Sequence, residues 1–144
     1  MATFEDKDTG WSEFVKSIQN FKKNDEEALG VGFEDPEVAK IAVFNEFGTS
    51  KIPERPFIRP TVDQNEKKYL NMMTKAADKI AKGTPADTAF MPVATTLQTD
   101  IQNAIKGLKT PPNTEQTLEE KSGANPLIDT GKMLKSVVIV KGVK

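Results

Sequence analysis

Apolar residues near the start of the chain recur with the spacing of a helix. Between about residues 11 and 22 they lie three and four positions apart, which predicts a short amphipathic helix. One role for such a helix is to cover the hydrophobic core. Its apolar side chains are Trp11, Phe14, Val15, Ile18 and Phe21.

A strand and a second helix follow. Residues 29–33 read Leu-Gly-Val-Gly-Phe, and an apolar side chain at every second position predicts a half-buried strand. Asp35 and Pro36 then begin a helix, because proline suits the first turn and an aspartate before it can accept backbone N–H bonds. Gly48 ends this helix.

Two longer helical stripes occupy the middle of the chain. Residues 61–82 form the longest periodic segment, and residues 83–85 (Gly-Thr-Pro) make a stop and a turn. The second long helix is expected to start near Phe90, because Pro92 is tolerated only in a first turn. We expect the two helices to pair antiparallel, and Met72 and Met73 to fill the core. The stripes are Tyr69, Met72, Met73, Ala76 and Ile80, then Phe90, Val93, Leu97, Ile101, Ile105 and Leu108.

The end of the chain supplies one more strand. Residues 137–140 are Val-Val-Ile-Val, a β-branched run whose expected partner is the strand at 29–33. The elements together predict one α+β domain over residues 1–144. In it, a small antiparallel β-sheet packs with an antiparallel pair of long helices, shorter helices and an extended proline-rich strap.

Residues 107–126 differ from both flanks in composition. They are rich in Lys, Thr, Pro, Asn, Glu and Gly, which predicts an exposed, mobile loop with one or two helical turns over 114–121. A loop of this length inside a compact domain favours a functional role, such as ordering against a neighbour.

Residues 52–60 carry three prolines, Pro53, Pro56 and Pro60. Each proline fixes its own φ and pushes the residue before it out of the helical region, so this segment is predicted to be a stiff, extended strap. Two interpretations fit the residues between the prolines. In one, Phe57 and Ile58 attach a rigid connector to the core of the domain; in the other, the strap binds a partner.

Composition narrows the chemistry that this chain can perform. It has 20 Lys and Arg against 21 Asp and Glu, so no strong overall charge attracts nucleic acid or an anionic membrane. It has neither cysteine nor histidine, which excludes disulfides, thiolate and imidazole chemistry and almost every zinc site. The sequence shows no signal peptide and no membrane span, so we expect a protein made and kept in the cytosol.

The carboxylates give no sign of catalysis. Adjacent acidic pairs stand in polar surroundings, where solvated surface charge is the expected role. Glu46 lies at the end of an apolar helix, and a salt bridge or hydrogen bond to Arg55 or Arg59 is expected there. We therefore predict no enzyme, no catalytic residue, no cofactor and no metal site.

Non-specific DNA binding is an alternative from a different class. Lysines are frequent on the predicted long helix, at Lys67, Lys68, Lys75, Lys79 and Lys82. No aromatic residues alternate with them, which disfavours reading of bases but permits contact with phosphates.

Three segments carry a resemblance to a known family. They are Asn45 to Thr49 (Asn-Glu-Phe-Gly-Thr), residues 52–60 (Ile-Pro-Glu-Arg-Pro-Phe-Ile-Arg-Pro), and residues 126–134 (Pro-Leu-Ile-Asp-Thr-Gly-Lys-Met-Leu) with Ser136. In sequence and order they resemble the neck, tail-completion or virion-morphogenesis proteins of tailed bacteriophages and prophages. The resemblance covers roughly residues 28–140, and its motifs are structural rather than catalytic.

The resemblance implies a non-enzymatic subunit of the virion neck, assembled in the cytoplasm of the host bacterium. Copies would form an oligomeric ring that joins or completes the tail and leaves a channel for genomic DNA. Its partners would be further copies of itself, a portal or adaptor protein, and a tail-tube or terminator protein, with no membrane involved. A tail-terminator ring and a minor capsid protein are alternatives within the same class.

A ring requires two different surfaces that meet between neighbouring copies. We expect the strap and the loop at 107–126 to supply them, with Phe57 as the apolar anchor. The suspected interface residues are Ile52, Arg55, Phe57, Ile58, Arg59, Thr110, Asn113 and Glu115. The suspected structural motif residues are Glu46, Phe47, Gly48, Asp129 and Gly131.

Overall fold

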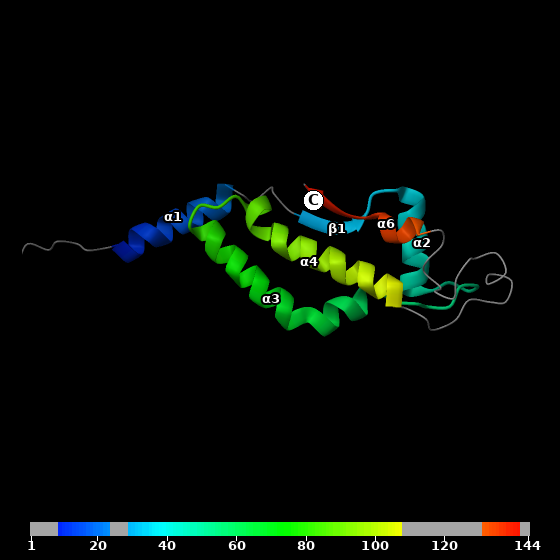
Figure 1. Ribbon diagram of the computed structural model, residues 1–144. Coiled ribbons are helices and arrows are strands. Elements are labelled where there is room, and N and C mark those ends of the chain that lie inside the picture. Colours follow the sequence, from blue (N-terminus) through cyan, green and yellow to red (C-terminus); the bar gives the residue numbers. More distant parts are fainter. Residues whose placement is uncertain (1–8, 24–28, 108–130, 142–144) are drawn as a thin grey trace, which may run out of the picture.

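The computed structural model describes residues 9–23, 29–107 and 131–141, and it confirms the predicted α+β class (Figure 1). Its described elements combine helices with a two-stranded antiparallel sheet. In chain order they are α1 (Thr9–Lys23), β1 (Leu29–Phe33), α2 (Pro36–Phe47), α3 (Arg59–Ala81), α4 (Ala86–Gly107), α6 (Lys132–Lys135) and β2 (Val137–Lys141).

The two predicted strands pair as expected. Leu29 lies opposite Lys141 and Phe33 opposite Val137, so the strands run antiparallel over their full length. Helix α4 packs against both strands. Side chains from both strands, α2, α4, α6 and the strap form the main core, whose buried members are Val38, Ala42, Phe57, Ile101, Ile105, Met133 and Val137.

Helices α3 and α4 form the predicted antiparallel pair. Ala76 and Ile80, late in α3, are buried in one cluster with Ala86 and Ala89, early in α4. Tyr69, earlier in α3, donates a hydrogen bond to Asp100, late in α4, at 2.6 Å. Small alanines where the helices join allow their backbones to approach closely there.

The predicted start of the second long helix was wrong. Helix α4 begins at Ala86 rather than near Phe90, so Pro92 lies inside it. Proline has no N–H for the carbonyl of Thr88, but both residues are on the exposed side, where water can bond that carbonyl. Packing of Ala86 and Ala89 against α3 stabilises the additional turn.

Two details of α3 also differ from the prediction. The helix starts at Arg59 rather than Thr61, so Arg59 is helical and the strap ends at Ile58. Proline at the second helical position needs no N–H partner, which is why Pro60 fits inside the first turn. Met73 is exposed rather than a core residue, whereas Met72 is partly buried.

Helix α2 begins and ends as predicted. The Asp35 carboxylate accepts the backbone N–H groups of Glu37 at 2.9 Å and Val38 at 3.4 Å. These bonds hold the pKa of Asp35 below its ordinary value, and nearby Lys132 lowers it further. Helix α6, a single turn after Gly131, was not predicted; it places Met133 in the core.

Helix α1 forms where it was predicted but does not cover the core. Figure 1 shows it extending away from the body of the molecule, with its C-terminal part next to the end of α3. Its large apolar side chains remain exposed: Trp11, Phe14, Ile18 and Phe21. The role of core cover expected from the sequence is therefore wrong for this helix.

Candidate functional site

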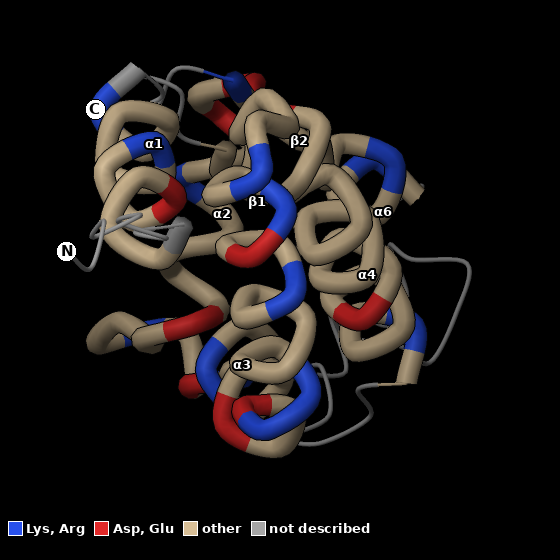
Figure 2. The backbone as a smooth tube through the Cα atoms, turned by 90° about the vertical axis from the view of Figure 1, so that its left-hand side faces the viewer, with Lys and Arg blue, Asp and Glu red and all other residues tan. Residues whose placement is uncertain are grey.

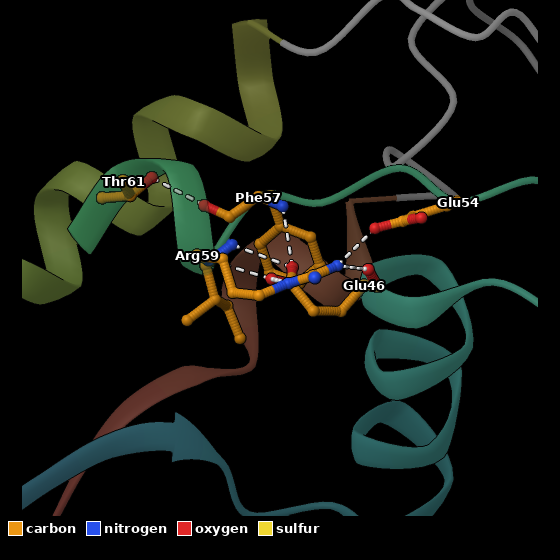
Figure 3. Close-up of polar contacts among 6 residues, drawn as sticks. Glu46, Glu54, Phe57, Arg59 and Thr61 are labelled. Carbon is orange, nitrogen blue, oxygen red and sulfur yellow. Dashed lines mark hydrogen bonds and ion pairs between the residues drawn. The ribbon is translucent and has the colours of Figure 1, made fainter. Parts of the chain in front are cut away.

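The carboxylate of Glu46 is the centre of the junction between helix α2 and the proline strap (Figure 3). Only 3% of this residue is exposed. One carboxylate oxygen accepts the backbone N–H groups of Phe57 at 2.7 Å and Ile58 at 2.9 Å, and the other accepts that of Arg59 at 2.9 Å. A single acidic side chain thus holds three consecutive peptide groups, at the end of the strap and the start of α3, in place.

Arg59 completes the junction, and of the two predicted partners of Glu46, Arg55 and Arg59, it is the one that forms the ion pair. Its Nε lies 3.1 Å from a Glu46 carboxylate oxygen, and one terminal nitrogen donates to the Glu46 backbone carbonyl at 2.6 Å. The same nitrogen pairs with the exposed Glu54 at 2.5 Å. The guanidinium also lies 4.7 Å from the ring centroid of Phe47, in cation–π geometry.

These contacts set the charge states of both groups. Burial by itself would raise the pKa of Glu46, but the backbone hydrogen bonds from the strap and the bond from Arg59 together hold that pKa below its ordinary value. Hydrogen bonds to Glu54 and Glu46 raise the pKa of Arg59. The junction is therefore an ion pair at neutral pH, and its hydrogen bonds are of the stronger, charge-assisted kind.

Gly48 and Thr49 turn the chain from α2 into the strap. Gly48 has φ 71° and ψ 171°, a conformation that is nearly restricted to glycine. A Cβ at this position would lie 3.0 Å from the backbone nitrogen of Glu54. The Thr49 hydroxyl accepts the N–H of Ile52 at 2.9 Å, and the Thr49 N–H donates to the Ile52 carbonyl at 2.8 Å, which closes the turn.

Phe57 attaches the strap to the core of its own chain. The residue is 1% exposed, and its ring meets that of Phe33 edge-on with centroids 6.2 Å apart. The Thr61 hydroxyl donates to the Phe57 carbonyl at 2.6 Å, so both backbone groups of Phe57 have partners. This is the connector interpretation of the strap; burial leaves Phe57 almost no surface to offer to another subunit.

The remaining strap residues divide between interior and surface. Arg55 is buried, burial lowers its pKa, and its backbone N–H donates to the Asn45 carbonyl at 2.6 Å. Ile52 and Ile58 are partly buried, whereas Arg59 is exposed. Contact of these residues with a second copy stays a prediction, and the surface available for it is that of Ile52, Pro53, Glu54 and Arg59.

The structure brings together the motif residues Glu46, Phe47 and Gly48 with the strap. Gly131, which adopts φ 69°, lies apart from this junction, at the start of α6. Four other predicted residues lie outside the described part of the chain: Thr110, Asn113, Glu115 and Asp129. The predicted loop at 107–126, apart from Gly107, and its helical turns at 114–121 also lie outside it.

Sequence reasoning missed the apolar outer face of α2. Phe47 is 63% exposed, and Ile41 and Val43 are exposed beside it, although Val38 and Ala42 already form the buried face. The available signal was that apolar residues of α2 fall on every side of the helix. This pattern is typical of a helix covered on more than one side.

A shallow groove of about 640 Å³ lies beside the N-terminal half of α4. At its edge the carboxylate of Asp87 pairs with Lys141 of β2 at 3.1 Å, which keeps the pKa of Asp87 low. The described residues contain no group of three or more acidic side chains that could hold a metal ion. None of the described helices combines the length and the apolar character needed to cross a membrane.

Comparison of the chain with protein-family models, with curated proteins and with solved structures found no match.

Proposed function

We propose that this chain is a structural protein of the neck of tailed bacteriophage virions. Copies assemble into a ring at the junction between head and tail, join or complete the tail, and leave a channel for DNA. The ring contacts a portal or adaptor protein on one side and a tail-tube or terminator protein on the other. The sequence resemblance of residues 45–60 and 126–136 to neck and tail-completion proteins supports this proposal.

The observation that carries the proposal is the bonding of Glu46 to the backbone N–H groups of Phe57, Ile58 and Arg59, at the end of the strap and the start of α3. Four residues of the resembling motif are parts of one junction: Glu46 and Arg59 form the ion pair, Gly48 makes the turn, and Phe57 attaches the strap to the core. The motif therefore specifies a rigid ribbon, of which Pro53, Glu54 and the adjoining Arg59 are exposed. A ribbon that is already ordered loses little conformational entropy when a neighbouring subunit binds it.

Non-specific DNA binding is supported less well. The lysines of α3 are exposed, but Lys68 pairs with Asp100 at 2.6 Å and Lys82 with Asp78 at 2.8 Å. Figure 2 shows acidic and basic residues interspersed along α3 rather than a basic stripe. Mixed charge on this face weakens the attraction for a phosphate backbone.

The deciding experiment is electron microscopy of particles made without this subunit. Full heads and finished tails that fail to join are the expected products. Overlong tails would assign the chain to the tail terminator instead, and normal infectious particles would overturn the proposal.

Complementation with variants tests the strap directly. Ile52→Asp places a charge on the partly exposed edge of the strap; the variant, checked for folding by circular dichroism, is expected to yield unjoined heads and tails. Leu70→Asp, a matched change at an exposed position of α3, serves as the control and should restore infectivity.

If the chain instead acts by binding DNA, Ile52→Asp has no effect. Joint replacement of Lys75, Lys79 and Lys82 by glutamine then abolishes a strongly salt-dependent retention on DNA. A neck subunit of the proposed kind assembles normally with these three glutamines.

A further inference from the structure

Helix α1 presents its apolar side to solvent. Trp11 is 62% exposed, and Phe14, Ile18 and Phe21 are exposed along the same side of the helix. We call these four residues the α1 stripe. Such a row of large apolar side chains, two of them aromatic neighbours whose ring centroids lie 5.7 Å apart (Trp11 and Phe14), is typical of a helix that docks on another surface.

The contact of α1 with its own chain uses a different side of the helix. Asn20 donates its side-chain amide to the carbonyl of Ala81, at the end of α3, at 2.8 Å. Asn20 lies about two and a half turns from Trp11, which places it on the opposite side of α1. The polar side of α1 therefore faces the body of the molecule, and the four residues of the stripe are exposed.

Helix α2 carries the second open apolar surface. Its outer face consists of Ile41, Val43, Phe44 and Phe47, with Val43 53% exposed. The Lys40 ammonium lies 5.9 Å from the Phe44 ring centroid, and the Arg59 guanidinium covers part of Phe47. The opposite face of this helix is in the core, and on the outer face Ile41, Val43 and Phe47 remain exposed although Arg59 covers part of Phe47.

The two surfaces lie at opposite ends of the molecule. Figure 1 shows α1 projecting at one end and α2 standing at the other, with α3 and α4 between them. They cannot meet within one copy. Two different apolar surfaces at opposite ends of a chain are what a head-to-tail contact between identical copies requires, and such contacts generate a ring when the rotation between neighbouring copies closes.

We propose that the α1 stripe of one copy docks on the outer face of α2 in the next copy. The inference deepens the proposed ring, on which it rests, by naming the two surfaces that meet. The docked surface lies next to the strap, because Phe47 of the outer face contacts Arg59, the residue that directly follows the strap.

Charge agrees with an antiparallel arrangement of the two helices. The stripe spans about 15 Å from Trp11 to Phe21, ten residues at 1.5 Å each, and with Trp11 opposite Phe47 it extends along α2 back to Glu37. The exposed Lys22 at the end of the stripe then lies opposite the exposed Glu37 at the start of α2. Opposed helix dipoles favour the same orientation.

Cysteine cross-linking tests the contact, since the chain has no cysteine of its own. Purified Phe14→Cys protein is mixed with Val43→Cys protein under mild oxidation. A disulfide-linked heterodimer is the expected product, because antiparallel docking places these positions side by side. A double variant, with both cysteines in each copy, should give a ladder of covalent oligomers.

Two control pairs make the result specific. Trp11→Cys with Glu37→Cys, which only a parallel arrangement brings together, should give much less cross-linking. Phe14→Cys with Lys67→Cys, on the exposed side of α3, should give none. A heterodimer of Trp11→Cys with Glu37→Cys would overturn the antiparallel orientation, and Phe14→Cys homodimers alone would mean that two stripes pair with each other.

Trp11 provides a second readout because it is the only tryptophan in the chain. As protein concentration rises, docking should shift its emission to shorter wavelengths. Joint replacement of Val43 and Phe47 by serine, which leaves α1 unchanged, should weaken this self-association at least about tenfold, as loss of an aromatic anchor does. Leu70→Ser should not.

An emission shift produced by anionic phosphatidylglycerol vesicles, with no concentration-dependent shift and no cross-link, would assign the stripe to a lipid surface and overturn the proposal. Different results would overturn the proposed neck function and the proposed contact between α1 and α2. Normal particles without the subunit defeat the neck function whatever the cross-linking shows, whereas unjoined heads and tails together with absent cross-links defeat only the named contact.

Discussion

The strap junction and helix α1 use similar residues in opposite ways. Phe57 of the strap is 1% exposed inside its own core, whereas Phe14 of α1 stands in solvent. The strap obtains its order from within the chain, through Glu46, while α1 contributes its polar side to the chain and leaves the apolar one open. Phe57 thus stabilises the fold of its own chain. Phe14 adds little to that fold and is exposed, as the proposed assembly requires.

The largest difference between the regions is expected for phenylalanine truncation. Phe57→Ala should lower the free energy of unfolding by about 3–5 kcal/mol, because it leaves a cavity in the core. Phe47→Ala, the matched change at an exposed position ten residues earlier, should stay within about 0.5 kcal/mol. Chemical denaturation of both variants measures the contrast, and equal losses would mean that Phe57 is not a core residue.

Removing the charge of Glu46 should have the next largest effect on the free energy of unfolding. Glu46→Gln keeps the size of the side chain but turns an NH₂ group toward strap N–H donors, and it should destabilise the fold by about 3 kcal/mol. Glu54→Gln breaks only the exposed pair with Arg59 and should cost less than about 1 kcal/mol. Urea titrations of the two variants distinguish a buried acceptor from a surface ion pair.

A side chain at Gly48 should strain the turn. Gly48→Ala is expected to cost about 1–3 kcal/mol, because φ 71° with ψ 171° is disfavoured for alanine and the new Cβ meets the Glu54 backbone. Gly10→Ala in α1, where a Cβ meets nothing within 4 Å, should instead be neutral or slightly stabilising. Thermal denaturation measures the stability of both variants. Equal changes in melting temperature for Gly48→Ala and Gly10→Ala would contradict this account.

Low pH should remove part of the stability that Glu46 contributes to the fold. The pKa of Glu46 in the folded protein is below its ordinary value of 4.5, so its stabilising effect is complete above that pH and declines as pH falls through the lower folded value. The stability difference between wild type and Glu46→Gln should therefore shrink from pH 5 toward pH 3. The variant is the proper reference because the other carboxylates with lowered pKa, Asp35, Asp87 and Asp100, remain in both proteins.

The smallest effect on stability is expected in α1. Phe14→Ser removes an exposed ring and should change the free energy of unfolding by less than about 0.5 kcal/mol. Its effect should be on self-association instead. A large destabilisation of the dilute monomer, measured by urea denaturation, would show that the stripe supports the fold of its own chain.

Local patterns in the sequence determined much of this protein. Alternation at residues 29–33 and β-branching at 137–140 identified the two strands, and Asp35 with Pro36 identified the start of α2. The pairing of Glu46 with an arginine of the strap followed from the same kind of reasoning, because a carboxylate at the end of an apolar helix requires a partner. These signals are local because they depend on backbone conformation and hydrogen bonding within a few residues.

Tertiary structure alone decided which apolar side chains are buried. The periodicity of α1 and that of α3 look alike in the sequence, yet Trp11 is exposed and Ile80 is in the core. Packing against α3 placed the start of α4 at Ala86, before a proline that local rules assign to a first turn. The physical reason is that spacing fixes the side of a helix on which a residue lies, whereas burial depends on the partner that distant segments bring to that side.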